Sequence, residues 1–488
     1  MAADLQWQGA PSVTPVVVSI PTVTPQVTPQ PTPTGAPLPS PTPTPDLLHQ
    51  PPIIYYTQAG DTLPALAVRF GVKVDEIQSN QPLPATGLLS PNTMLLIPRR
   101  LWNTTSSTHL IPDSEIVFSP SAIDFDTQAF VAQAGGYLST YHEYLKSTGR
   151  TSGADIVASV ALNNSINPRL LLALLDYQGH WVTGHPGNVA EKDYPLGHIE
   201  RRYKGLYPQL AWAVNQLSIG YYGWREGLLT EITFRDGTSV RLAPDLNAGT
   251  VALAYFFAQV SANSTAWLQA MDPVHGFPAF YAQMFGDPWA RAYTVEPLYP
   301  PDLTQPPFIL PFEPDTPWLF TGGPHGAWEH DGARAALDFA PGGTQGCAIS
   351  YKWVVAVASG VVVRSGNGVV MLDLDGDGRE QTGWDVLYLH IADAGRVPAG
   401  TRLKVGDRIG HPSCEGGVAT GTHLHIARKY NGEWMAADGP VPFVMDGWVP
   451  HAGAEPYEGT LTKDGKTIVA CPCGSPSQMI VREEEHAP

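Results

Sequence analysis

The chain has 488 residues, enough for several domains, and its 45 acidic and 28 basic side chains give a net charge of −17. This charge argues against nucleic acid as a main partner, because binding a phosphate backbone needs clustered Lys and Arg, and it argues against docking on anionic lipid. The sequence has no run of about 18 apolar residues, so we expect no membrane span. We expect a soluble monomer.

Residues 1–52 form a predicted stalk. From residue 11 onward nearly every residue is Pro, Thr, Val, Ser or Gln, and such a segment cannot bury a core. Proline's fixed φ favours an extended, disordered spacer instead. The first ten residues lack the basic and apolar regions of a signal peptide. We therefore expect that an export signal has been removed, the alternative being that the chain leaves the cell by another route.

Residues 53–100 predict a small unit in the order strand, helix, helix, strand. Gly60-Asp61-Thr62 predicts a turn with a helix cap at Asp61 or Thr62, Gly71 ends that helix, and residues 74–80 predict a second short one. The unit resembles the LysM module over nearly its full length; the matching residues are Tyr56, Gly60, Asp61, Thr62, Leu63, Ala67, Phe70, Gly71, Ile77, Asn80, Leu96, Ile97 and Pro98. This resemblance implies binding of glycans that contain N-acetylglucosamine, namely peptidoglycan or chitin.

Residues 115–290 predict a mostly helical domain. Pro168 after Asn167 marks a helix start, and the run that follows resembles the helix before the catalytic Glu of lysozyme-like transglycosylases. Tyr177-Gln178-Gly179 stands where that family has its Glu, so no general acid is available there. We therefore expect a non-catalytic, lysozyme-like domain, which either retains a groove for glycan or acts only as a spacer.

A Pro-rich linker at residues 291–317 leads into short β-rich runs over residues 318–455, separated by Gly, Asp and Asn turns. This pattern predicts an antiparallel all-β domain. Residues 456–488 predict a C-terminal hairpin, turning at Asp464-Gly465, and a tail. The predicted fold class is multidomain: a small α/β module, a mostly α-helical middle domain and an antiparallel all-β C-terminal domain.

Two histidines in Gly421-Thr422-His423-Leu424-His425-Ile426 suggest a metal site. Residues i and i+2 share a face of a strand, so His423 and His425 point one way and their apolar neighbours the other. Such a pair suits a metal ion, although two hydrogen-bonded histidines on a half-exposed sheet would look the same. In the run VLYLHI, the same alternation places His390 on one face with Val386 and Tyr388.

The order of ALDFAP, VVAVASGVVVRSG, VLYLHI, VGDRIG and GTHLHI resembles the lysostaphin and β-lytic class of zinc endopeptidases, metallopeptidase family 23, over residues 318–450. The resemblance implies that Asp338 and His425 bind Zn²⁺. It also implies that His390 and His423 flank the ion as catalytic residues, which polarise the water and stabilise the oxyanion. Three protein ligands leave one position on the zinc ion for water. Zinc lowers the pKa of that water and polarises the scissile carbonyl.

The third zinc ligand has two candidates. Lysostaphin-like members place a His four residues before the Asp, but that position is Arg334, which stays protonated and cannot ligate zinc. The β-lytic branch uses a longer spacing in a Gly-rich segment, which favours His325 in TGGPHGAW. His330 is the alternative; otherwise it lines the cleft or lies in a solvated loop.

All four cysteines lie in the last third of the chain. β-lytic members carry a Cys shortly before the histidine pair, as Cys414 is here, and the resemblance makes Cys347 its expected disulfide partner on the cleft wall. Cys471 and Cys473 are too close in an extended chain to pair without strain, so their state stays open.

The segment DLDGDGREQTGWD suggests a second cation. Asp373, Asp375 and Asp377, followed by Gly, match the first half of a calcium-binding loop. Trp384 replaces the Glu at position 12, and no helix pair flanks the segment. The alternatives are a structural Ca²⁺ and an acidic hairpin turn.

These observations favour a secreted, extracellular or wall-associated zinc endopeptidase that cuts peptide bonds of peptidoglycan, glycine-containing ones above all, and is held at the wall by LysM. A second hypothesis is a non-catalytic wall-binding or amidase-activating protein with a degenerate peptidase domain. Retention of all the expected zinc-site residues argues against it. A third hypothesis, glycan cleavage by the helical domain, is disfavoured by the missing Glu.

Overall fold

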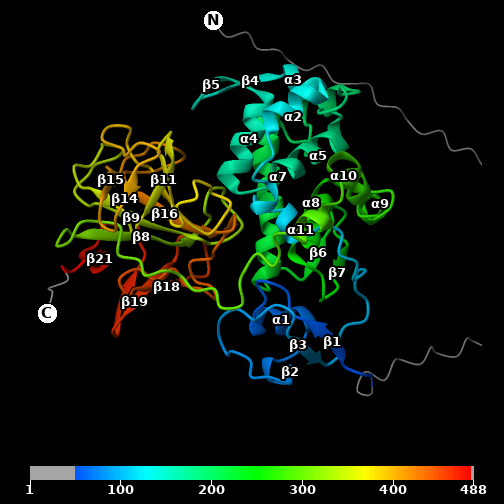
Figure 1. Ribbon diagram of the computed structural model, residues 1–488, viewed down its shortest axis with the longest axis horizontal. Helices are drawn as coiled ribbons and strands as arrows, with labels where there is room; N and C mark the ends of the chain where they lie inside the picture. Colours follow the sequence, from blue (N-terminus) through cyan, green and yellow to red (C-terminus); the bar gives the residue numbers. More distant parts are fainter. Residues whose placement is uncertain (1–49, 485–488) are drawn as a thin grey trace, which may run out of the picture. The chain divides into compact units, whose positions relative to one another are not determined.

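A computed structural model describes residues 50–484. The predicted stalk lies outside the described residues except for its last three, as does the expectation about an export signal. A small α/β unit, a group of helices and an antiparallel β domain follow one another along the described chain (Figure 1). The predicted fold class is therefore confirmed.

The α/β unit has one helix against a small sheet. Its elements are β1 (Ile53–Tyr56), α1 (Leu63–Phe70), the 3₁₀ turn η2 (Val74–Glu76), β2 (Gln78–Ser79) and β3 (Met94–Ile97), with strand order β1-β3-β2. Thr62 caps α1 and Gly71 ends it with φ of 65°, as predicted. The second helix expected over residues 74–80 is wrong beyond its first turn, because the backbone of Gln78 and Ser79 pairs with β3 instead.

Helices α2 to α11 make up the middle of the chain. They are α2 (Thr127–Ala134), α3 (Tyr137–Thr140), α4 (Gly153–Asn164), α5 (Pro168–Gly179), α6 (Val189–Asp193), α7 (Leu206–Arg225), α8 (Ala248–Val260), α9 (Ser264–Ala270), α10 (Phe277–Phe285) and α11 (Pro288–Ala292). Asn167 caps α5 with its side chain, and Leu170 to Leu175 are fully buried. Two hairpins lie between the helices: β4 (His142–Leu145) with β5 (Gly149–Ser152), and β6 (Glu231–Thr233) with β7 (Ser239–Arg241). Within residues 50–484, no helix combines the length and the apolarity that crossing a bilayer requires.

The β domain is built on one large sheet in which all strand pairs are antiparallel. The strands run in the order β14 (Arg402–Leu403), β11 (Gly360–Gly366), β12 (Val369–Asp373), β13 (Trp384–Leu389), β16 (Leu424–Tyr430), β9 (Ala336–Ala340), β8 (Trp318–His325) and β21 (Met479–Ile480), with β17 (Glu433–Trp434) beside β16. Two smaller sheets join β18 (Val449–Ala452), β19 (Gly459–Lys463) and β20 (Lys466–Val469), and β10 (Val354–Val355) with β15 (Arg408–Gly410). The hairpin β19–β20 turns at Asp464-Gly465, as predicted.

The two faces of the large sheet belong to different cores. One face packs inside the β domain; its residues include Val370, Leu372, Val386, Tyr388, Leu424 and Ile426. The opposite face shares a core with the helices, and its residues include Val369, Met371, Leu387, Leu389 and Ala427. Side chains alternate along each strand, so a residue's position in β13 or β16 decides which core it joins.

A buried arginine links the three kinds of structure. Arg225, the last residue of α7, lies 3.1 Å from the carboxylates of both Asp113 and Glu433. Its guanidinium also fills the space beside Gly60, where a Cβ would stand only 2.1 Å from Nη1. Side-chain contacts at this point therefore tie the α/β unit, the helices and strand β17 together.

Candidate metal centre

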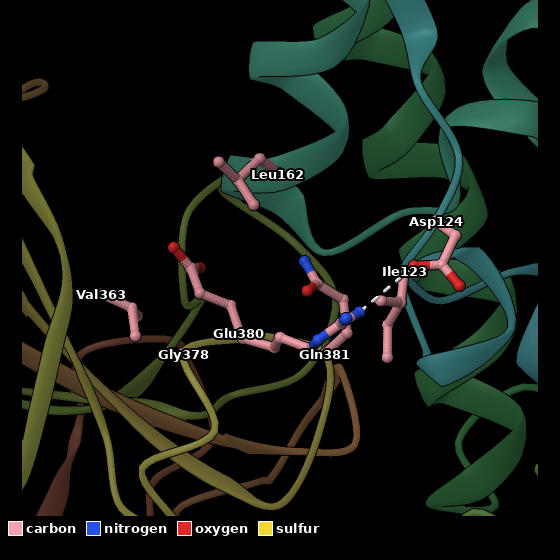
Figure 2. A pocket seen from close by; sticks show the side chains of 8 residues that line it. Ile123, Asp124, Leu162, Val363, Gly378, Glu380 and Gln381 are labelled. Atoms are coloured by element: carbon pink, nitrogen blue, oxygen red, sulfur yellow. Dashed lines mark ion pairs between the residues drawn. The ribbon is translucent and has the colours of Figure 1, made fainter.

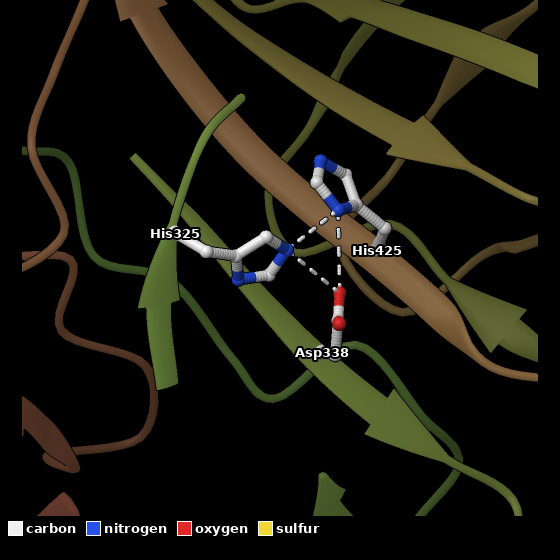
Figure 3. Close-up of side chains that lie close together, drawn as sticks. All are labelled: His325, Asp338 and His425. Carbon is white, nitrogen blue, oxygen red and sulfur yellow. Dashed lines mark hydrogen bonds and ion pairs between the residues drawn. The ribbon is translucent and has the colours of Figure 1, made fainter. Parts of the chain in front are cut away.

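Three neighbouring strands bring His325, Asp338 and His425 together (Figure 3). His325 ends β8, and His425 of β16 lies directly opposite Asp338 of β9. Directly opposite residues in an antiparallel pair share a face of the sheet, so the imidazole and the carboxylate are neighbours. Gly322 stands opposite Asp338 on β8, where a Cβ would come within 2.7 Å of its Oδ2. A glycine is therefore required beside the carboxylate.

The facing atoms of this group converge on one point. His325 Nε2 and His425 Nδ1 are 3.0 Å apart, and they lie 3.3 and 3.2 Å from Asp338 Oδ1. The other nitrogen of each ring contacts a main-chain carbonyl, of Gly323 at 2.8 Å and Ala327 at 3.0 Å. A carbonyl only accepts, so that nitrogen carries the hydrogen and the converging nitrogen presents a lone pair.

The residues fit a zinc ion. Asp338 Oδ1 is buried and has no hydrogen-bond partner in the described part of the chain, although two ring nitrogens lie near it. Tetrahedral ligands about 2.0–2.1 Å from Zn²⁺ would stand roughly 3.3 Å from one another, close to the separations found here. Two imidazoles and one carboxylate are also a donor set that zinc accepts. A cation at this point would give Asp338 Oδ1 the partner that the protein does not supply.

The pKa shifts of these three residues also favour a bound cation. Burial raises the pKa of Asp338, but the three neighbouring histidines outweigh this effect, and the pKa falls well below its usual range. Burial lowers the pKa of His425. For His325, burial lowers the pKa but the Asp338 carboxylate reverses the effect, so the net shift is upward. A metal ion would compete with that proton for Nε2.

The structure brings His325, and not His330, to the other two expected ligands. The His325 side chain is 2% exposed, whereas that of His330 is 76% exposed and lies 3.0 Å from Asp331. His330 belongs to the solvated part of the loop between β8 and β9.

His423 and His390 stand beside this centre. Their ring centroids are 4.4 Å apart, and His423 Nε2 is 3.8 Å from Asp338 Oδ1. Each donates through Nδ1 to a main-chain carbonyl, of Gly421 and Glu415 respectively, both at 2.8 Å. Their Nε2 atoms are therefore left as acceptors. Burial, with the charges of His423 and His425, lowers the pKa of His390 to about 3.

The expected orientation of His390 is wrong. Strand alternation would place it with Val386 and Tyr388 in the internal core of the β domain. Strand β13 instead ends at Leu389, and His390 adopts a left-handed backbone with φ of 66°. This turn sends the ring to the opposite face, towards His423 and His425. A non-glycine residue with such a φ is uncommon and is often found at functional sites.

Sequence reasoning missed one neighbour of the centre. The ring of Tyr457 stacks on His325 with centroids 4.0 Å apart. Burial and the Asp338 charge raise its pKa. Tyr457 lies in the segment expected to be hairpin and tail, and no motif surrounds it, so the sequence held no signal for it.

Both cysteine pairs are joined. Cys347 and Cys414 have their sulfurs 2.13 Å apart, next to the loop that carries Glu415. Cys471 and Cys473 are also linked, across Cα atoms 5.3 Å apart. Sequence analysis left their state open, because an extended chain would hold them too close to pair without strain; here the chain turns at residues 472–473.

Comparison with known proteins adds independent observations. The family model for the LysM domain matches residues 55–98, and that for the LasA N-terminal domain matches residues 109–300, which span the helices. Protease LasA from two strains of Pseudomonas aeruginosa is 27% identical over 348 and 351 residues, 67% of this chain and 75% of the relatives. The resemblance to the LysM module is confirmed, and the chain is similar to a protease over two thirds of its length. The LysM domain thus coincides with the α/β unit β1–β3.

Solved structures similar to the chain include family 23 metallopeptidases. Pseudoalterin, a deep-sea metalloprotease, is 19% identical, with a TM-score of 0.31 over 37% of this chain and 100% of its own. The catalytic domain of lysostaphin from Staphylococcus simulans is 21% identical, with a TM-score of 0.18 over 26% of this chain and 89% of its own.

Proposed function

We propose that this chain is a secreted zinc metalloendopeptidase that hydrolyses peptide bonds of peptidoglycan, and that its LysM domain binds it to the wall. The observation that carries the proposal is the convergence of His325 Nε2, Asp338 Oδ1 and His425 Nδ1 on one point. Similarity to Protease LasA supports peptide-bond hydrolysis, and the LysM match supports peptidoglycan as the partner. His325, Asp338 and His425 would hold the ion.

Zinc, when bound, supplies a Lewis acid that polarises the scissile carbonyl and lowers the pKa of water. The chain's own histidines handle the proton. His423, the more exposed of the pair, accepts a proton at Nε2 from the attacking water and returns it to the leaving amine. His390, kept neutral by burial, accepts a hydrogen bond at Nε2 and orients the water.

The two alternative functions have weaker support. A degenerate peptidase would not be expected to keep three converging ligand atoms and two histidines with fixed ring orientations. For glycan cleavage, the carboxyl nearest in sequence to the position of the missing Glu is that of Asp176 in α5. Its oxygens accept hydrogen bonds from the N–H groups of Val182 and Thr183 and from the Thr183 hydroxyl, which makes it a structural residue.

Mass analysis of peptidoglycan digests tests the function. We expect new amino termini in the products, no new reducing sugar ends, and loss of release after chelation, with recovery when Zn²⁺ is added back. The His425→Ala chain is the matched control and should release nothing. Reducing ends would establish a glycan enzyme, and product release by metal-free protein would exclude the zinc mechanism.

A further inference from the structure

Four aspartates lie in or beside the loop between β12 and β13. Asp373 ends β12, Asp375 and Asp377 lie in the loop, and Asp385 is the second residue of β13. Asp373, Asp375 and Asp377 each present a carboxylate oxygen within 4.8 Å of the others. Sequence analysis singled out these three but not Asp385. In a calcium-binding loop that begins at Asp373, the last ligand is expected at position 12, which is Trp384.

The loop wraps around the first carboxylate. The two oxygens of Asp373 accept N–H groups from Asp375 at 3.0 Å, Gly376 at 2.9 Å and Gly378 at 2.8 Å. Asp377 in turn accepts the N–H of Arg379 at 2.9 Å. These bonds alone describe an ordinary acidic turn, so the case for a ligand depends on the fourth residue.

Asp385 is fully buried, and neither of its carboxylate oxygens has a hydrogen-bond partner among residues 50–484. It lies directly opposite Asp373 in the β12–β13 pair, so the two side chains share a face with Cβ atoms roughly 5 Å apart. A buried carboxylate without a partner costs far more folding free energy than a buried neutral polar group without one. Its environment therefore calls for a cation or a proton.

The nearby basic side chains are engaged elsewhere. Lys429 stands opposite Asp385 on β16, but its ammonium bonds to Glu380 at 3.1 Å. Arg364 also bonds to Glu380, at 2.6 and 3.1 Å. Burial raises the pKa of Asp385; Lys429 counters this, while the charges of Glu380, Asp373 and Asp375 add to it. Within residues 50–484, no salt bridge joins a basic side chain to any of the four aspartates.

We propose that Asp373, Asp375, Asp377 and Asp385 bind a Ca²⁺ ion. The site offers only oxygen donors, which a hard cation prefers and which differ from the nitrogen-rich centre expected to take zinc. Ca²⁺ takes 6–8 oxygen ligands in flexible geometry, so carboxylates from an irregular loop and a strand suit it better than they suit Mg²⁺. Main-chain carbonyls and water would complete the shell.

The position of the loop gives the ion a structural role. Side chains of Ile123, Asp124 and Leu162 from the helical part face loop residues 378–381 across a hollow, and Arg379 pairs with Asp124 at 3.5 Å (Figure 2). Arg364 reaches Asn163 of α4 at 2.6 Å. An ion that fixes the loop would therefore also stabilise its contact with the helices.

Equilibrium dialysis of the zinc-loaded full chain against CaCl₂ tests the proposal. We expect one Ca²⁺ per chain and an affinity reduced at least tenfold by Asp385→Asn. Asp464→Asn, an exposed hairpin-turn substitution, is the matched control and should bind like the wild type. Absence of binding at millimolar Ca²⁺ would overturn the proposal. Equal binding by Asp385→Asn would do the same, as would loss of Ca²⁺ binding in His425→Ala, which would place the ion at the other centre.

Tb³⁺ luminescence of the wild-type chain provides a second readout that does not require an aspartate variant to fold. Trp384 adjoins Asp385 in the chain, so its excitation should sensitise a Tb³⁺ ion bound here, and Ca²⁺ should displace the signal. Trp384→Phe should remove most of the luminescence and leave Ca²⁺ dialysis unchanged. Sensitised emission that Ca²⁺ does not displace would contradict the assignment. None of these measurements requires the chain to be a peptidase, so the proposal stands or falls apart from the proposed function.

Discussion

The histidines around the metal centre share one arrangement. In each, one ring nitrogen donates to a main-chain carbonyl, of Gly323, Ala327, Gly421 or Glu415. Main-chain atoms in strands and tight turns move little, so the rings are oriented before any ligand arrives. The opposite nitrogens are left for chemistry, and preorganised groups of this kind need no reorganisation during the reaction.

The choice of the third ligand is a prediction at this scale. We expect His325→Ala to lose bound zinc and nearly all hydrolysis, because only two ligand atoms remain at the point of convergence. The matched change His330→Ala, in the same loop but with an exposed side chain, should leave zinc content and rate within about twofold, as surface substitutions usually do. Metal analysis of the two purified variants checks this, and the opposite pattern would reassign the ligand.

Glu329 predicts a pH effect on stability. Burial raises its pKa from 4.5 to about 7, so the folded chain binds this proton more tightly than the unfolded chain. Its contribution is therefore favourable below about pH 4.5 and is lost as the pH rises through 7. Glu329→Gln should raise the free energy of unfolding by up to about 3 kcal/mol at pH 8 and change it little at pH 4.5.

Urea unfolding at both pH values measures the Glu329 effect. Glu231→Gln, an exposed change of the same chemical kind on β6, is the matched control. A stability difference between Glu329→Gln and the wild type that stays constant with pH would show that the carboxyl does not titrate as described.

At the scale of elements, helices α7 and α8 approach unusually closely at Gly220. A Cβ there would stand 2.8 Å from Ala252 Cα, 2.9 Å from Tyr255 Cβ and 3.0 Å from the Val251 carbonyl. Two of these atoms belong to the backbone and cannot rotate away. The helices must separate to admit even one methyl group.

Gly220→Ala should therefore destabilise the chain by about 1–3 kcal/mol, as overpacking does, although Ala favours helix by nearly 1 kcal/mol. The control is Gly366→Ala in β11, where an added Cβ meets nothing within 4 Å. Thermal unfolding of both variants distinguishes packing from propensity, and a more stable Gly220→Ala would refute the tight contact.

Local patterns predicted the elements better than the side chains between them. Thr62, Gly71 and Asn167 act locally as caps, so the sequence sufficed to place their helix ends. His390 could not be oriented, because its face depends on a single left-handed φ that ends β13. Asp385 was also missed, since only the pairing of two strands brings it to Asp373. Short-range chemistry can be predicted from the sequence, whereas contacts that depend on register or on one dihedral angle cannot.

At the scale of the whole molecule, Arg225 is the main charged link. Its guanidinium is buried and pairs with Asp113 and Glu433, while Tyr221 also donates to Glu433 at 2.9 Å. A buried pair gives little net stability relative to a well-packed apolar core, but losing one partner leaves a buried charge. The contact therefore makes the helices and the β domain depend on each other.

Arg225→Met should lower the free energy of unfolding by about 3–5 kcal/mol, and adding Glu433→Gln should recover part of the loss. The matched control is Arg379→Met, which breaks an exposed pair and should cost less than about 1 kcal/mol. Calorimetry of the three variants checks the order. Equal effects of Arg225→Met and Arg379→Met would show that the buried ion pairs contribute no more to stability than an exposed one.

The disulfide between Cys347 and Cys414 lies close to His390 and His423, the proposed catalytic pair, so its redox state should affect their positions. Cys414 directly precedes Glu415, whose carbonyl orients His390, while the N–H of Thr422, next to His423, donates to Gly346. Reduction by a non-chelating phosphine should therefore loosen the positions of His390 and His423 but leave the proposed zinc ligands in place. We expect turnover to fall while bound zinc stays constant, and we expect both to be normal after reoxidation. A chain with Cys471→Ser and Cys473→Ser should respond in the same way. The chain would then be active only in an oxidising compartment and idle in a reducing one.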